Sequence, residues 1–299
     1  LALQLNTSGS NNAGIGRESL LRNTTGASNT ALGSTSLDAN TTGSFNTAIG
    51  QASLTTNTTA SNNTAVGYNS LGANTTGTRN VAVGANSLDT NTTGSYNVGV
   101  GNFTLNNNTT GQQNTALGED AMDANTTGSY NVGIGRIALQ SNTTGTENTA
   151  LGYQALAANT TGNYNTGIGQ GALDSQTTSN NNTALGWNAG HVISTGANNT
   201  CIGTSAGDTI STGNSNIIIG YVSDVSTSGG SSQFVLGNGV TCVGNGNFTF
   251  GDGTSDSNIA NGATTITAPS DIRLKEDIQD EEVGLDFIND LRPVTFQWK

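Results

Sequence analysis

The sequence predicts an all-β fold, a parallel β-roll or β-solenoid built from 17-residue turns. A Gly recurs with this fixed period from Gly16 to Gly237, which makes fourteen turns in one unbroken register. Only 32% of the 299 residues are hydrophobic and 42 are Gly, a composition that suits a thin continuous core better than a round one. Each turn is too short to hold two helices, and the Asn, Thr and Gly that fill it are poor helix formers.

Counted from the Asn that begins each turn, the fourth residue is always Ile, Leu or Val, and the second is Thr or Val in most turns. Residues two apart lie on the same face of a strand. We expect both positions to point inward and to form the wall of a narrow core. The predicted core column contains Ile49, Val66, Val83, Val100, Leu117, Ile134, Leu151 and Ile168.

The third residue, between those two, is Ala or Gly in eleven successive turns from Gly14 to Ala184. Because it lies on the opposite strand face, we expect it to point outward, where small residues allow another backbone to approach. The alternative is that small residues suit a thin solenoid wall. The predicted inter-subunit column contains Ala31, Ala48, Ala65, Ala82, Gly99, Ala116, Gly133, Ala150, Gly167 and Ala184.

Two further kinds of column complete each turn. The ninth residue, Leu in nine of the ten turns from Leu20 to Leu173, predicts a second inward column, which Gly190 and Gly207 interrupt. The corner Asn residues suit left-handed corners and can stack their amides from turn to turn. The Asn-Thr-Thr words from Asn23 to Asn159 also match the N-glycosylation pattern, although a structural role at the corners already explains them.

Charge and composition exclude several functions. A net charge of −12 argues against a nucleic-acid partner. One His, with Cys201 and Cys242 far apart, leaves no metal-ligand set, so we expect no metal or cofactor and two small buried Cys residues. No apolar run approaches the roughly 18 residues that cross a bilayer, so we expect no membrane insertion. Residues 1–11 have no initiating Met and no signal peptide, and we interpret them as the continuation of a longer chain.

The words Asn-Thr-Ala-Ile-Gly at 46–50 and Asn-Thr-Ala-Val-Gly at 63–67 resemble the head repeats of trimeric autotransporter adhesins. The resemblance covers residues 12–237, and the turns here are longer than that family's usual repeat. It implies a left-handed β-roll in which three chains pack around a common axis. With turns about 4.8 Å apart, fourteen of them make a rod of roughly 65–70 Å.

The sequence changes character after Gly237. Residues 238–269 lose the repeat register and predict a β-rich neck, and residues 270–299 hold a large share of the charges in the chain. Leu285, Ile288 and Leu291 have helical spacing before Pro293. The words SDIRLKEDI and LRPVTFQWK resemble the start of the C-terminal intramolecular chaperone, a self-cleaving peptidase, of phage tail fibres and tailspikes.

That resemblance implies that three chains wind together with help from the chaperone, which is then cleaved off just before its Ser. By position, the nucleophile would be Ser270 and the assisting base would be Lys275, whose amine can act as a base if burial lowers its pKa. Pro269 before the scissile bond, and a segment shorter than a complete chaperone domain, depart from the family pattern. The alternative is that Ser270 caps a turn and Lys275 pairs with a carboxylate.

These observations lead to one functional interpretation and two competitors. The chain is interpreted as the shaft or adhesin part of a homotrimeric extracellular fibre, on a virion tail or a bacterial surface, with an unknown receptor for which a glycan is one candidate. Its only predicted enzymatic activity is self-cleavage. The competitors are a non-fibre binding solenoid for ice or glycans, suggested by the repeated Thr-Thr pairs, and a tailspike that degrades polysaccharide. Asp38, Asp89, Asp123 and Asp174 recur at one repeat position but have no partner column for hydrolysis.

Overall fold

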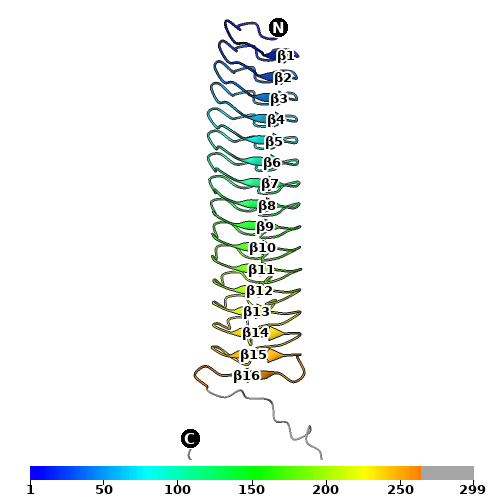
Figure 1. Cartoon of the computed structure of the whole chain (residues 1–299), viewed down its shortest axis with the longest axis vertical. Helices are drawn as coiled ribbons and strands as arrows, with labels where there is room; N and C mark the ends of the chain where they lie inside the picture. The colour runs from blue at the N-terminus through cyan, green and yellow to red at the C-terminus, as the bar shows by residue number, and fades with distance from the viewer. Residues whose placement is uncertain (264–299) are drawn as a thin grey trace, which may run out of the picture.

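A computed structural model describes residues 1–263 of the chain. They form a straight rod in which short strands are stacked one above another in chain order (Figure 1). All the strands belong to one sheet, and its order follows the sequence without a crossover. The strands are β1 (Ala13–Ile15), β2 (Thr30–Leu32), β3 (Thr47–Ile49), β4 (Thr64–Val66), β5 (Val81–Val83), β6 (Val98–Val100), β7 (Thr115–Leu117), β8 (Val132–Ile134), β9 (Thr149–Leu151), β10 (Thr166–Ile168), β11 (Thr183–Leu185), β12 (Thr200–Ile202), β13 (Ile217–Ile219), β14 (Phe234–Gly237), β15 (Phe248–Gly251) and β16 (Ser257–Ile259).

The predicted all-β parallel solenoid is confirmed, and so is its 17-residue turn. Each strand from β1 to β14 pairs in parallel with the next, so that a residue faces its equivalent one repeat further on, as Ala48 faces Ala65. Within residues 1–263 no helix combines the length and the apolarity that a membrane span requires. The helix expected around Leu285, Ile288 and Leu291 lies outside the described residues.

Backbone pairing extends beyond residues 12–237 at both ends of the solenoid. Before β1, the backbone N–H groups of Leu3 and Leu5 donate to the carbonyls of Ser19 and Leu21, so residues 3–9 already stack as part of a turn. After β14, strand pairing continues although the turn becomes three residues shorter, so that Phe234 pairs with Phe248. Only β16 breaks the pattern, because it runs antiparallel to β15.

The interior contains the expected Leu column together with the column that we had placed outside. Leu20, Leu37 and the equivalent residues up to Leu173 are buried, as expected. The Ala residues of the third column are buried too, with Ala48, Ala65 and Ala82 at 0% exposure. A Cβ atom added to Gly133 would lie 2.8 Å from Met122 Cγ, and one added to Gly167 would lie 3.3 Å from Leu156 Cγ. The third column therefore packs against the ninth across a very narrow core.

This packing corrects two predictions. The small column is not an inter-subunit contact surface: it is buried inside its own chain, and it is small because the Leu column leaves no more room. The corrected residues are Ala31, Ala48, Ala65, Ala82, Gly99, Ala116, Gly133, Ala150, Gly167 and Ala184. The predicted core column is likewise not in the core. Its members Ile49, Val66, Val83, Val100, Leu117, Ile134, Leu151 and Ile168 are half-buried or exposed on the outer face of the sheet.

Two ladders of buried Asn side chains run through the rod, as the sequence predicted. At the Asn-Thr-Thr corner, Asn91 Nδ2 donates to Asn74 Oδ1 at 3.0 Å and to the Gly94 carbonyl at 3.0 Å. At the start of each turn, the N–H of Asn97 donates to Asn80 Oδ1 at 2.9 Å, and Asn97 Nδ2 donates to the Gly111 carbonyl at 2.8 Å. These bonds satisfy polar groups that would otherwise be costly to bury.

The Asn ladders also show whether the Asn-Thr-Thr motifs are accessible for N-glycosylation. The Asn residues of the nine Asn-Thr-Thr words, from Asn23 to Asn159, are all at 0% exposure, so the folded rod offers none of them to a glycosyltransferase. The left-handed corners are made by other residues. In the turn that contains β3, Phe45, Ala52 and Leu54 have φ values of 60°, 58° and 50°, whereas Asn46 and Asn57 do not have positive φ.

The recurring Gly column has a steric cause. Gly50 has φ of 128°, and a Cβ atom added there would lie 2.3 Å from the carbonyl oxygen of Gly67 in the next turn. A side chain at this position would collide with the backbone of the next turn and would require a backbone conformation that favours Gly. The Gly that revealed the period is therefore the residue that permits the turns to stack.

Candidate interaction surface

The outer face of the sheet carries a continuous stripe that we call the apolar strip, defined as the second and fourth residues of the turns that contain β2 to β14. It begins with Thr30 and Leu32 and ends with Phe234 and Leu236. In each of these turns the residue at the fourth position is Leu, Ile or Val, and the residue at the second position is Thr, Val, Ile or Phe. None of them is charged. Leu32, Leu117 and Leu185 are each more than 40% exposed. A stripe of this length and apolarity on the outside of one chain is typical of an interaction surface.

Two columns of variable side chains, several of them aromatic, flank the apolar strip. The leading column is the residue before the Asn that begins each turn, and the trailing column is the residue after the Gly that follows each strand. The leading column contains Phe45, Tyr96, Tyr130 and Tyr164, and the trailing column contains Tyr68, Tyr153, Trp187 and Tyr221; all eight aromatic residues are exposed. The four leading aromatic residues have φ between 60° and 62°, so each lies at a left-handed corner directly beside the strand.

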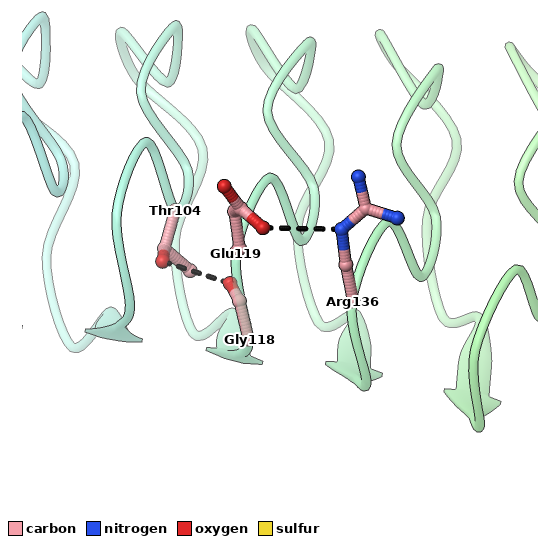
Figure 2. Close-up of polar contacts among 4 residues, drawn as sticks. All are labelled: Thr104, Gly118, Glu119 and Arg136. Carbon is pink, nitrogen blue, oxygen red and sulfur yellow. Dashed lines mark hydrogen bonds and ion pairs between the residues drawn. The ribbon is translucent and has the colours of Figure 1, made fainter.

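Arg side chains contact an aromatic ring in each column. The guanidinium of Arg79 lies over the ring of Tyr96, 5.2 Å from its centroid, and also donates a hydrogen bond to the Tyr96 hydroxyl. In the trailing column Arg136 lies 5.9 Å from the centroid of Tyr153. Its Nε also donates to Glu119 Oε2 at 3.1 Å in the turn before (Figure 2). Both charged groups are about half exposed, so this ion pair orders the column but adds little stability.

Sequence reasoning missed this surface although a signal for it was present. Tyr96, Tyr130 and Tyr164 are spaced by two whole turns, and so are Tyr153, Trp187 and Tyr221. A spacing of two whole turns places such residues in one line on the rod. A consensus for the turn hides this signal, because the aromatic residues occupy positions whose residue type changes from turn to turn.

A pair of carboxyl groups lies near the C-terminal end of the repeat. Asp224 occupies the position that Leu holds in earlier turns and is only 7% exposed. Its Oδ1 accepts the N–H of Val225 at 2.7 Å, and its own N–H donates to the Val240 carbonyl at 2.7 Å. Burial, with a further contribution from the Asp208 carboxyl, raises the pKa of Asp224 from 3.8 to about 7.

We expect Asp224→Asn to stabilise the rod at pH 8 and to change its stability much less at pH 4. The folded chain keeps the Asp224 proton up to a pKa of about 7, whereas the unfolded chain loses it near 3.8. The stability contributed by the protonated group is therefore fully present below pH 3.8 and is lost as the pH rises through 7. Thermal unfolding of both variants at pH 4 and pH 8 measures this, and equal Tm differences at the two pH values would contradict it.

The remaining site predictions have different outcomes. Within residues 1–263 no cluster of His, Cys, Asp and Glu residues could hold a metal ion. Cys201 and Cys242 are buried free thiols, as expected, and burial raises the pKa of the Cys201 thiol to about 12. Ser270 and Lys275, the residues predicted for self-cleavage, lie outside the described residues, and their roles stay predictions.

Comparison with known protein families gives a match at the C-terminal end of the chain. Residues 270–299 match the peptidase family described as the chaperone of endosialidase. The same segment resembles a self-cleaving intramolecular chaperone in its sequence motifs. The match confirms this resemblance. No curated protein matches the chain.

The rod and the matched segment define a class of protein. A β-solenoid of about fourteen turns precedes a segment that matches the endosialidase-chaperone family in the same chain. This combination fits a fibrous protein of the tail-fibre or tailspike kind. The matched family is a peptidase family, and the match is consistent with self-cleavage.

Proposed function

We propose that the chain is the shaft of a homotrimeric extracellular fibre, on a virion tail or a bacterial surface, that mediates attachment to a host or a surface. The observation that carries the proposal is the apolar strip, which runs along the whole repeat without a charged residue. In a single chain it would leave a long row of Ile, Leu and Val side chains in water. Assembly of several copies through their strips removes that row from solvent.

The dimensions of one turn favour three copies. The leading and trailing residues of a turn are six positions apart, so the outer face is at most about 20 Å wide. Three such faces arranged as a triangular prism place the common axis about 6 Å from each backbone, a gap that branched aliphatic side chains from three copies fill. Four faces would leave the axis about 10 Å away and an open channel along an apolar lining.

Two copies packed strip to strip would also bury the apolar strip, at the usual sheet separation of about 10 Å. The matched chaperone family favours three, because the resemblance to it implies three chains that wind together. The shaft would then be a rigid spacer, and the repeated turns would offer repeated contacts to a surface, which favours avidity.

The mass of the fibre in solution tests the proposal. Light scattering on the protein expressed from its complete gene is expected to give three times the mass of the single polypeptide that a denaturing gel resolves. For the 299 residues of this sequence the single-chain mass is 30.1 kDa. A particle with the mass of one polypeptide would refute the fibre assembly.

Self-cleavage before Ser270 is the enzymatic part of the proposal. In the protein expressed from the complete gene, Ser270→Ala is expected to give one longer polypeptide where the unmodified protein gives a released C-terminal fragment, because the hydroxyl is the proposed nucleophile. Lys275→Ala should do the same, and Ser255→Ala, in the loop before β16, serves as the control. An unchanged product size in Ser270→Ala would remove the cleavage from the proposal.

A further inference from the structure

The leading and trailing columns complement each other turn by turn. Eight of the described turns carry an aromatic residue in one column, each of these is matched by a non-aromatic residue in the other column, and no described turn carries two. The pairs that contain an aromatic residue are Phe45 with Gln51, Asn62 with Tyr68, Tyr96 with Asn102, Tyr130 with Arg136, Glu147 with Tyr153, Tyr164 with Gln170, Asn181 with Trp187, and Ser215 with Tyr221. Within one chain the two members of a pair lie at opposite edges of the apolar strip and cannot fill each other's space.

Cyclic assembly brings the two edges together between copies. When identical rods are placed around an axis parallel to their length, with the apolar strip toward that axis, the leading edge of one copy meets the trailing edge of the next. The symmetry also keeps equivalent turns at the same height. Because the strands stack in unbroken chain order along the rod, this relation can extend over the whole repeat (Figure 1).

From this complementarity we infer that the leading column of one copy packs against the trailing column of the next copy, turn for turn, and fixes the register of the fibre. This rests on the proposed function and adds to it the residues that align the copies. The apolar strip repeats nearly identically in every turn, so on its own it would accept a partner shifted by a whole turn. The two columns differ from turn to turn and can reject such a shift.

Ring contacts agree with the unshifted register. The charges do not select it, because no turn carries two charged residues in its columns, whereas a shift by one turn would place Glu147 against Arg136. In the unshifted register, Arg136 of one copy faces Tyr130 of the next, a pairing that interfaces favour. A shift by one turn in one direction would instead place Tyr153 against Tyr164, so that two rings would meet where the unshifted register gives each ring a non-aromatic partner.

Engineered disulfides test the register directly. Ser28 and Ser34 are the leading and trailing residues of the turn that contains β2, and Ser→Cys changes little at either position. The double variant Ser28→Cys/Ser34→Cys is expected to form covalent trimers under mild oxidation, seen on a non-reducing gel after the remaining thiols are alkylated during denaturation. A bond within one chain is not expected, because strand β2 lies between the two residues and holds their Cα atoms farther apart than the limit of about 7 Å.

The controls separate register from assembly. The shifted control is the double variant Ser28→Cys/Ala85→Cys. Ala85 is the trailing residue three turns after Ser34, about 14 Å further along the rod. This variant should give no covalent trimer, and neither should Ser28→Cys or Ser34→Cys alone. Light scattering on each variant records whether the fibre assembles. A fibre of trimer mass in which only the shifted pair, or neither pair, forms a disulfide overturns the register inference and leaves the proposed function standing. A rod of single-chain mass overturns both and assigns the aromatic columns to some other partner.

A size exchange provides a second test that needs no oxidation. Asn102→Tyr places two rings in one turn and is expected to raise the concentration at which the fibre dissociates about tenfold or more, since overpacked contacts are strained. The exchange variant Tyr96→Asn/Asn102→Tyr should restore the original value within about threefold. Equal weakening in both variants would contradict the pairing of these two positions between copies.

Discussion

Leu117→Lys is expected to dissociate the proposed fibre into single folded rods. Leu117 lies in the middle of the apolar strip and is 49% exposed in the single chain, so a Lys there is compatible with the fold of one copy. Around a three-fold axis the same change brings three ammonium groups into an apolar space without partners. The expected cost is at least about 3 kcal/mol for each copy, which lowers the association constant by several orders of magnitude.

Light scattering measures the mass, and circular dichroism confirms that the β-solenoid is kept. Thr127→Lys is the matched control: it adds the same charge at an exposed corner of the same turn and should leave the mass unchanged. If Leu117→Lys keeps the mass of the unmodified protein, the apolar strip does not face another copy, and the trimer proposed through it is wrong.

Asn91→Asp is expected to produce the largest loss of stability in the single rod. Asn91 donates two hydrogen bonds, to Asn74 Oδ1 and to the Gly94 carbonyl, and accepts one from Asn108 Nδ2 at 2.8 Å. An ionised Asp keeps the accepted bond but places its charge against two buried oxygen atoms. Loss of both donated bonds and burial of the charge should cost about 3–6 kcal/mol, which lowers Tm by roughly 10 °C or more.

The pH dependence of this variant gives a check on the mechanism. When the introduced carboxyl group is protonated, it donates one hydrogen bond again, so the deficit should shrink at pH 4 relative to pH 8. Thr93→Ala removes the same glycosylation pattern at an exposed position and should change the free energy of unfolding by less than about 0.5 kcal/mol. Similar Tm values for the two variants at pH 8 would mean that the Asn ladder contributes little.

Several features of the fold could be predicted from the sequence because each repeats at every turn. The period follows from the Gly column, in which Gly50 and its equivalents permit close stacking. The Leu column and the Asn ladders followed from the burial of apolar side chains and from the need to satisfy buried amides. In each case one chemical requirement fixes one position.

The direction of the strand faces could not be decided by the same reasoning. Size alone suggested that Ile49 points inward and Ala48 outward, and the structure has the reverse orientation. What decides the orientation is the width of the core, and that width depends on Leu54 and its equivalents on the opposite wall. A period-2 pattern identifies which residues share a face but not which face is buried, and an apolar outer face makes the two assignments look equally good.

The aromatic columns were missed for a related reason. Tyr96, Tyr130 and Tyr164 differ from their neighbours in the same column, so a consensus for the turn removes them. Features that build a repeat are the same in every turn, whereas features that position one copy against another must differ between turns. Candidate interaction residues in such a chain are therefore found among the departures from the consensus.

The reversal at β16 has a consequence for how rods behave at high concentration. A stack of parallel turns ends in a row of free backbone N–H and C=O groups, which is a template for the first turn of another rod. Strand β16 is three residues long and pairs antiparallel with β15, so it takes up the backbone groups of β15 that a further parallel turn would use. The edge that β16 presents is therefore not the parallel edge on which the first turn of another rod would stack.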